Sequence, residues 1–217
     1  MQTSQSTPRN TTEELVSVVE KDFNREWLDF SKITHYFRLL FSKKTTDLLE
    51  SVDTFLDIDF EKLRSNWKTT IILDVDECIA PHHGYILPKN LEKIIQLHNN
   101  GWKIIIDSNM KKSDRYQPLE DLGIPILTSK YAKPHRKNFE ICLQIMDSHP
   151  EQTVMIWDNF ITDGGAMRLW IDFIKVKPVP LDASDGWAER EGQKLTRRII
   201  DKKAIKRGHI KNYNIKK

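Results

Sequence analysis

Residues 69–78, Thr-Thr-Ile-Ile-Leu-Asp-Val-Asp-Glu-Cys, combine a short apolar run with two aspartates at its end. The run is rich in bulky and β-branched residues and too short for a surface helix, so it predicts a strand buried on both faces. Asp74 and Asp76 then belong at the carboxyl end of the strand, where ligands bind in parallel α/β sheets. The backbone is expected to bend out of strand geometry there, so that both carboxylates reach one ligand.

Outward from this stretch, apolar runs alternate with amphipathic segments, a pattern typical of βαβ units and a parallel sheet. Further strands are expected at residues 103–108, 124–127, 153–158 and 171–176. Helices are expected between them at residues 89–100, 113–121, 136–147 and 162–170. The predicted fold class is therefore a three-layer, doubly wound parallel α/β sheet.

The chain before residue 61 predicts a helical extension that follows a disordered lead over residues 1–10. Capping-box spacing between Thr11 and Glu14 begins a helix over about residues 12–28. A second helix is predicted for 33–49 and a short connecting helix for 54–63. The apolar face of the second helix suits packing within the protein, a partner or a membrane surface.

Positive charge is concentrated at the other end of the chain. Residues 190–217 contribute +9 to a formal net charge of +3, which leaves −6 for the preceding residues. A basic helix is predicted from about Ala188, with apolar residues along one side. This composition indicates an anionic neighbour, phospholipid or nucleic acid, although a solvated basic tail explains it equally well. The chain thus divides into an extension (1–60), an α/β domain (61–187) and a basic helix or tail (188–217).

Several classes of protein are not indicated. No apolar run is longer than the four residues 154–157, so no segment is predicted to span a bilayer. The first ten residues lack the apolar region of a secretory signal. Cys78 and Cys142 form no disulfide framework, which favours a reducing compartment such as the cytoplasm or an organelle matrix. The sequence leaves the oligomeric state open.

Polar side chains follow the predicted strands in a fixed order. An acid pair ends the first strand, a serine ends the second, a Lys-Pro follows the third, and two acids follow the fourth. The residues are Asp74, Asp76, Ser108, Lys133, Asp158 and Asp163. In a parallel sheet they all lie along one edge. An isolated Asp-x-Asp is common in loops, whereas this ordered set of polar residues is a far more specific indication of a catalytic site.

The ordered set resembles the motifs of the haloacid dehalogenase superfamily of phosphohydrolases. Within that superfamily the sequence is most similar to the YqeG-type group, which includes mitochondrial and plastid phosphatidylglycerophosphate phosphatases. The narrower resemblance is carried by segments outside the motifs, namely residues 57–63, Ala132-Lys-Pro134, Thr162-Asp163 and the run from Pro178 to Arg198. It covers roughly residues 35–207.

The resemblance implies a Mg²⁺-dependent hydrolase of phosphomonoesters that forms an aspartyl-phosphate. Asp74 would be the nucleophile, and Asp76 would protonate the leaving group and then activate water. Mg²⁺ would be bound by Asp74, Asp158 and the main-chain carbonyl of Asp76, with oxygen ligands of the kind this ion prefers. Asp163 would orient the metal-bound waters or Lys133.

The resemblance also implies a phosphate-binding set. Ser108, the adjacent Asn109 and nearby backbone N–H groups would bind phosphoryl oxygens. Lys133 would offset the charge of the phosphate and keep Asp74 ionised. These four residues, Asp74 included, are the expected phosphate contacts.

The sequence departs from the family pattern at a few positions. Asp-x-Asp is normally followed by Asn-Thr or Gly-Thr, whereas this chain has Glu77-Cys78. A small residue usually precedes the last-motif aspartate, whereas this chain has Trp157, which is expected to crowd the pocket. Cys78 has no evident base and is expected to be structural rather than nucleophilic. The pair His82-His83 in a turn is expected to be a surface loop.

The spacing of the motifs bears on the substrate. The segments from Asp76 to Ser108 and from Ser108 to Lys133 are too short for a mobile cap domain. An open site suits a large or surface-bound substrate, and with the basic tail this favours a lipid head-group phosphate such as that of phosphatidylglycerophosphate. The alternatives are a nucleotide or nucleic-acid-end phosphate, or a protein that binds phosphate and Mg²⁺ without catalysis.

Overall fold

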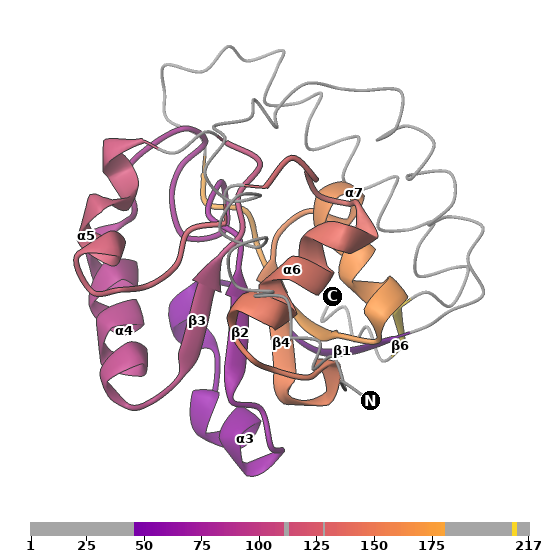
Figure 1. Cartoon of the computed structure of the whole chain (residues 1–217). Helices are drawn as coiled ribbons and strands as arrows, with labels where there is room; N and C mark the ends of the chain where they lie inside the picture. Colours follow the sequence, from indigo (N-terminus) through magenta and orange to yellow (C-terminus); the bar gives the residue numbers. More distant parts are fainter. Residues whose placement is uncertain (1–45, 111–112, 128, 181–209, 212–217) are drawn as a thin grey trace, which may run out of the picture.

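The sheet is the frame of the molecule (Figure 1). In the computed structural model, residues 46–110, 113–127, 129–180 and 210–211 are described. Six strands lie in the order β3-β2-β4-β5-β1-β6, and every pairing is parallel. The strands are β1 (Thr46–Val52), β2 (Thr70–Leu73), β3 (Lys103–Ile106), β4 (Thr153–Trp157), β5 (Asp172–Val176) and β6 (Ile210–Lys211).

Helices fill most of the connections, close to where the sequence predicts them. The α-helices are α3 (Phe60–Ser65), α4 (Pro88–Asn99), α5 (Gln117–Glu120), α6 (Arg136–Ile145) and α7 (Phe160–Asp163). The 3₁₀ helices are η1 (Phe55–Asp57), η2 (Asp114–Tyr116), η3 (Pro150–Gln152) and η4 (Gly164–Leu169). The predicted helix over residues 12–28, residues 33–45 of the helix predicted for 33–49, and all of the predicted basic tail except residues 210–211 lie outside the described residues.

Two cores cover the two faces of the sheet. Side chains alternate along each strand, so that in β2 Ile71 and Leu73 belong to one core and Ile72 to the other. The first core includes apolar residues of α3, α4 and α5, and the second includes those of α6 and η4. The result is a helix layer on each face of a parallel sheet, which confirms the predicted three-layer fold class.

The strand order creates a switch point between β2 and β4. The chain leaves β2 toward β3 on one side and returns to β4 on the other, so the connections from β2 and β4 diverge. The two strands are in register, with Leu73 opposite Ile156, and the N–H of Asp74 donates to the carbonyl oxygen of Ile156 at 3.0 Å. Ligands of open α/β sheets bind at such points, outside the carboxyl ends of the strands.

The helix predicted for residues 33–49 is wrong at its C-terminal end, which forms a strand of the sheet. Residues 46–49, at the end of the helix predicted for 33–49, belong instead to β1, which pairs with β5. This part of the predicted N-terminal extension is therefore part of the main sheet. Strand pairing to β5 overrides a weak local helical pattern here, because propensity is only a small term against tertiary contacts. Residues 210–211, predicted within the basic tail, form β6 against the other side of β1.

The strand predicted for residues 124–127 is reduced to a single bridge between Ile126 and Ile106. The N–H of Ile106 donates to Pro125 at 3.0 Å, and the N–H of Leu127 donates to Ile106 at 2.8 Å. Pro125 has no N–H to extend the ladder, and prolines are confined to the edges of sheets. The segment still passes beside β3 and so leads the chain along the carboxyl edge toward Lys133.

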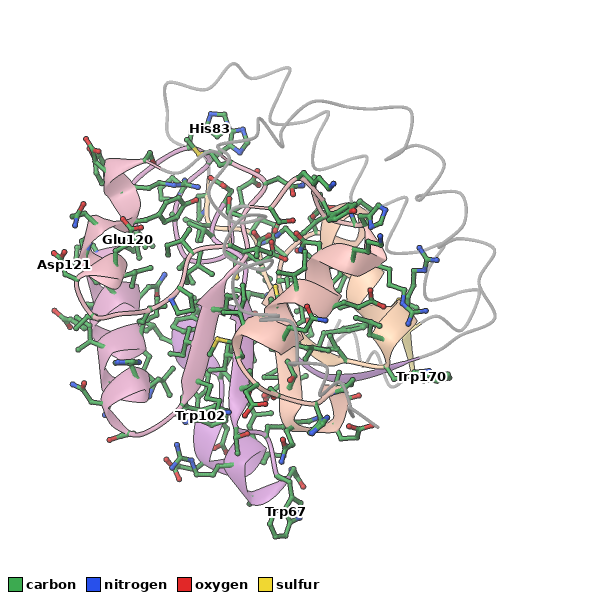
Figure 2. The ribbon with its side chains drawn as sticks, viewed as in Figure 1. Trp67, His83, Trp102, Glu120, Asp121 and Trp170 are labelled. Carbon is green, nitrogen blue, oxygen red and sulfur yellow. The ribbon has the colours of Figure 1, made fainter. Side chains whose placement is uncertain are left out.

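The two ends of the sheet expose different side chains. Trp67 and Trp170 precede β2 and β5, are 83% and 55% exposed, and both have left-handed backbones with φ of 64° and 63°. His83 lies at the opposite end of the molecule, in the loop that follows β2 (Figure 2). Buried acidic and basic side chains gather at this carboxyl end, among them Asp74, Lys133 and Asp158.

Gly165 in η4 gives a test of the packing beside the site. A Cβ at this position would collide with the carbonyl oxygen of Pro134 and the ring of Phe139. Gly165→Ala is expected to lower the free energy of unfolding by about 1–3 kcal/mol, measured by urea denaturation. Gly84→Ala is the control, because its Cβ meets only Pro81 side-chain atoms at 3.1–3.3 Å. Equal losses of unfolding free energy in the two variants would contradict the close packing of Gly165 against Pro134 and Phe139.

Candidate active site

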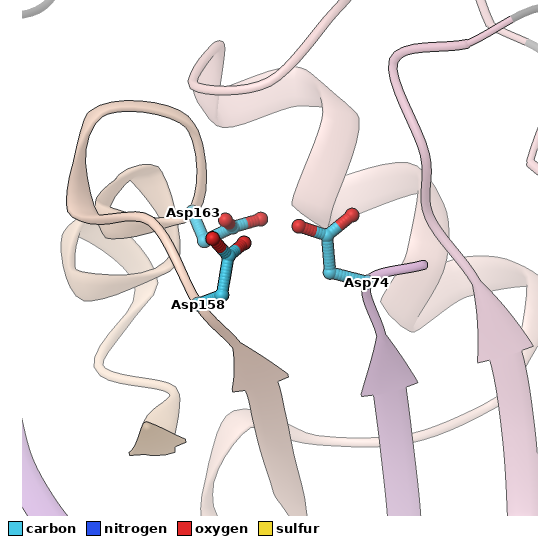
Figure 3. Close-up of side chains that lie close together, drawn as sticks. All are labelled: Asp74, Asp158 and Asp163. Carbon is cyan, nitrogen blue, oxygen red and sulfur yellow. The ribbon is translucent and has the colours of Figure 1, made fainter. Parts of the chain in front are cut away.

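Three buried carboxylates converge above the ends of β2 and β4 (Figure 3). Asp74 follows β2, Asp158 follows β4, and Asp163 ends α7. One oxygen from each lies within 4.8 Å of the others, and the residues are only 6%, 3% and 2% exposed. The structure therefore brings together the three aspartates that the sequence proposes as the side-chain environment of a metal ion.

Lys133 lies between two of these carboxylates. Its Nζ is 2.6 Å from Oδ1 of Asp74 and 2.6 Å from Oδ1 of Asp163, and the residue is 1% exposed. Burial by itself lowers the pKa of Lys133, but the charges of Asp163 and Asp74 outweigh it and raise the pKa above its ordinary value. The ammonium group therefore stays charged and offsets the two carboxylates.

Asn109 fixes the backbone that carries Lys133. Its Oδ1 accepts from the N–H of Lys133 at 2.9 Å, and its Nδ2 donates to the carbonyl oxygen of Lys133 at 3.2 Å. The sequence proposes Asn109 as a phosphate contact, but its side chain is engaged with this backbone. Asp107, which the sequence analysis did not single out, is fully buried, accepts from Nδ2 of Asn138 on α6 and also raises the pKa of Lys133.

The charge of the cluster fits a divalent cation. Three carboxylates face one ammonium group in a buried place, so these four described groups together carry a formal charge of −2 when all are ionised. Burial and the nearby Asp163 raise the pKa of Asp74 well above its usual range, and burial raises the pKa of Asp163 to about 6. Oxygen ligands and excess negative charge are what Mg²⁺ requires in proteins. The residues present therefore fit the ion that the sequence proposes.

Asp76 lies outside this cluster and is bound by Arg115. The guanidinium fork donates to both carboxylate oxygens, Nη1 to Oδ1 at 2.7 Å and Nη2 to Oδ2 at 2.8 Å. The N–H of His83 and the Oγ of Ser108 add hydrogen bonds of 2.9 and 3.1 Å. Burial raises the pKa of Asp76, but the hydrogen bonds and charge of Arg115 outweigh it and leave the pKa below its usual value. A metal contact through the main-chain carbonyl of Asp76 stays a prediction.

Sequence reasoning missed Arg115 because nothing local marks it. It lies in η2, seven residues after Ser108 and 39 residues after Asp76, and charged residues are ordinary in such loops. Its exposure of only 4% is visible in the structure alone. Unpaired arginines are seldom buried, so only the fold reveals that this one has a partner at the site.

A tight turn explains how the backbone leaves strand geometry after Asp74. The carbonyl oxygen of Val75 accepts from the N–H groups of Cys78, Ile79 and Ala80 at 3.0–3.2 Å. Glu77 at the apex is left-handed, with φ of 61°. Asn and Gly adopt this conformation most readily, which accounts physically for their use here in the family that the chain resembles. Glu77 adopts it despite the strain, and its Oε1 lies 3.4 Å from Nδ1 of His82.

Other expectations about the site concern Trp157, Cys78 and the histidine pair. Trp157 is buried in the second core, with its ring 5.4 Å from that of Phe173, and its effect on the pocket stays a prediction. Burial raises the pKa of the Cys78 thiol well above its usual range, and the three site carboxylates raise it further, so Cys78 is a protonated structural thiol. His82 and His83 stack on each other in the loop, with ring centroids 3.9 Å apart.

An apolar pocket of about 500 Å³ lies beside the turn. Its lining includes Phe55, Cys78, Leu87, Val176 and Val179. The N–H of Val179 donates to the carbonyl oxygen of Glu77, which ties the segment after β5 to the apex of the turn. Cys78 therefore separates the carboxylate cluster from a pocket that suits an apolar group.

Comparison with known proteins yields similar structures only. No family model matches the sequence, and no curated protein matches it. An uncharacterized protein from Listeria monocytogenes serotype 4b is 22% identical, with 60% of this chain and 99% of that chain covered and a TM-score of 0.41. The 3-deoxy-D-manno-octulosonate 8-phosphate phosphatase from Yersinia pestis is 14% identical, with 67% and 85% covered and a TM-score of 0.42.

The cobalt-bound deoxy-D-mannose-octulosonate 8-phosphate phosphatase from Haemophilus influenzae is 16% identical, with 66% and 94% covered and a TM-score of 0.40. At these identities and TM-scores the likeness does not carry a function to this chain. The function has to be judged on the side chains of its own site.

Mg²⁺ is expected to stabilise the protein in a pH-dependent way. Asp163 binds its proton more tightly in the folded state, so without metal the free energy of unfolding falls as pH rises from about 4 to about 6. Mg²⁺ at about 100 times its Kd should restore about 2.7 kcal/mol at about pH 7.5 and much less at about pH 4.5. Thermal unfolding with and without Mg²⁺ measures this difference. A Mg²⁺-induced shift in Asp158→Asn equal to that of the wild type would contradict the proposed ion site.

Asn109→Ala is expected to destabilise the chain by about 1–3 kcal/mol, because it leaves the buried backbone of Lys133 without two hydrogen bonds. Urea denaturation measures the loss. Asn66→Ala is the matched control, since it removes one exposed hydrogen bond to the carbonyl oxygen of Lys62. A loss no larger than that of the control would show that Asn109 does not position Lys133.

Proposed function

We propose that this protein is a Mg²⁺-dependent phosphomonoester hydrolase that forms an aspartyl-phosphate on Asp74. The observation that carries the proposal is the buried cluster of Asp74, Asp158 and Asp163 around Lys133 at the switch point of the sheet. A nucleophilic carboxylate, a fixed cation and a place for a divalent ion are the parts that phosphoryl transfer requires.

The chemistry follows from these side chains. One oxygen of Asp74 attacks phosphorus, and the bond to the leaving oxygen breaks as a protonated Asp76 gives that oxygen its proton; Asp76 recovers the proton from the water that attacks next. Water then attacks the phosphorus of the aspartyl-phosphate, which releases inorganic phosphate and restores the carboxylate. When bound by Asp74 and Asp158, Mg²⁺ supplies positive charge next to the phosphoryl oxygens. The charge of Lys133 lowers the pKa of Asp74 and so opposes the burial and the Asp163 charge that raise it, and Asp163 holds Lys133 in place.

The proposed substrate is a phosphate on a lipid head group, such as that of phosphatidylglycerophosphate. Between β2 and β3 the described chain contains only a loop and α4, so no inserted domain covers the carboxyl edge from this connection. The apolar pocket beside Cys78 supports a substrate with an apolar part. None of the described helices is both long and apolar enough to cross a membrane. The basic tail that also suggested an anionic surface lies almost entirely outside the described residues.

Phosphate release from a panel of substrates tests the proposal. The panel contains phosphatidylglycerophosphate in vesicles, a generic aryl phosphate, nucleotides and a 5′-phosphorylated oligonucleotide, each with Mg²⁺. The wild type is expected to act fastest on the lipid, and Asp74→Asn should release phosphate only at background rate because the nucleophile is lost. Glu140→Gln, on the exposed surface of α6, is the control and should keep full activity.

The outcomes separate the alternatives. Faster release from nucleotides or oligonucleotide ends would replace the lipid by a nucleic-acid substrate and keep the reaction class. No release from any substrate, together with no beryllofluoride adduct on Asp74, would overturn the enzyme proposal in favour of a protein that binds Mg²⁺ and phosphate without catalysis.

A further inference from the structure

Arg115 is a buried cation at the carboxyl edge that the proposed reaction leaves without a role. It is 4% exposed and comes from η2, on the connection that follows β3. Its planar fork makes a bidentate ion pair with Asp76, the residue expected to serve as general acid and base. A fork of this shape matches a carboxylate and a phosphoryl group equally well.

The guanidinium group has further polar neighbours beside Asp76. Nη2 lies 3.5 Å from Oγ of Ser108, the hydroxyl expected to bind phosphoryl oxygens. Nη1 also donates to the carbonyl oxygen of Gly84 at 3.2 Å, and the group lies over the ring of Tyr116 at 4.7 Å. Nε is buried, and among the described residues it has no hydrogen-bond acceptor. A donor in this state is costly until an acceptor arrives.

Among the described residues, the charges of the cluster favour a second cation for the substrate. Lys133 is the buried cation of the cluster, and it is already bound by the carboxylates of Asp74 and Asp163. A phosphoryl dianion brings two further negative charges, and Mg²⁺ offsets the carboxylates before it offsets the substrate. The guanidinium group of Arg115 is the cation placed at Ser108, on the side of Asp76.

From these contacts, and resting on the proposed phosphatase function, we infer that Arg115 binds the phosphoryl group by exchanging its fork from the Asp76 carboxylate to the phosphoryl oxygens. Without substrate, Asp76 serves as the anion that occupies the fork. With substrate, the phosphoryl oxygens replace it, and Asp76 is released to act at the leaving oxygen. The Asp76 carboxylate thus leaves its ion pair with Arg115 only when a phosphoryl group is bound.

The competition between two anions for one fork gives variants with opposite expected effects. Arg115→Lys keeps the charge but loses the bidentate geometry, so it should weaken orthovanadate binding by about 10- to 100-fold. Asp76→Asn removes the competing charge, so it should bind orthovanadate at least as tightly as the wild type. Both are measured by isothermal titration calorimetry on the full chain with excess Mg²⁺, alongside the KM for aryl phosphate, which should rise in Arg115→Lys.

A second buried ion pair provides the matched control. Lys68 lies 2.8 Å from Asp172 at the amino end of the sheet, and it is 4% exposed, the same as Arg115. Lys68→Met should lower the thermal unfolding temperature without changing orthovanadate affinity. This control separates a loss of stability from a loss of anion binding.

Three results would overturn the inference. Equal losses of orthovanadate affinity in Arg115→Lys and Asp76→Asn would show that the ion pair is only structural. An unchanged orthovanadate affinity in Arg115→Lys would show that the guanidinium group does not contact the anion. A wild type that does not bind orthovanadate would also overturn it. A wild type that binds orthovanadate through Arg115 but hydrolyses no phosphomonoester would support the binding role and contradict the proposed function.

Discussion

The ammonium group of Lys133, held between Asp74 and Asp163, is the interaction on which the site depends. Isolated charges of this kind are very costly to bury, and they persist here because each has a partner of opposite charge. Within the described cluster, Asp158 adds a third carboxylate to the one ammonium group, so the fully ionised cluster has a net negative charge. The remaining negative charge makes the site a place for a cation rather than a closed structural pair.

The fold supplies this arrangement from three separate connections, because Asp158 and Asp163 both lie between β4 and β5. Asp74 and Asp158 come from neighbouring strands at the switch point, Asp163 comes from the end of α7, and Lys133 comes from the connection between β3 and β4. Local hydrogen bonds fix two of these residues. The side chain of Asn109 holds the backbone of Lys133, and Thr162 Oγ1 donates to Asp163 Oδ2 at 2.8 Å. A mobile charge at any of these positions would lose the geometry that phosphoryl transfer needs.

Much of this arrangement is predictable from the sequence, because buried strands and their terminal acids leave a strong local pattern. The run from Thr70 to Leu73 and the aspartate after it imply both the strand and the edge at which the acid lies. Features that depend on contacts distant along the chain were not predictable. The strand β1 forms because β5 offers a partner, and Asn109 binds backbone rather than phosphate because Lys133 lies beside it. The pairing of Arg115 with Asp76 leaves no trace in either local sequence.

The turn after β2 separates two charge systems that originate one residue apart. Asp74 belongs to an anionic cluster with an excess of negative charge, whereas Asp76, beyond Val75, belongs to a neutral ion pair with Arg115. Strand alternation alone would point both carboxylates to the same face, and the left-handed Glu77 at the apex bends the chain just beyond them. The first system attracts a metal cation, and the second presents a guanidinium group beside Ser108. A phosphoryl group bound between them would meet positive charge on both sides, which neither system provides by itself.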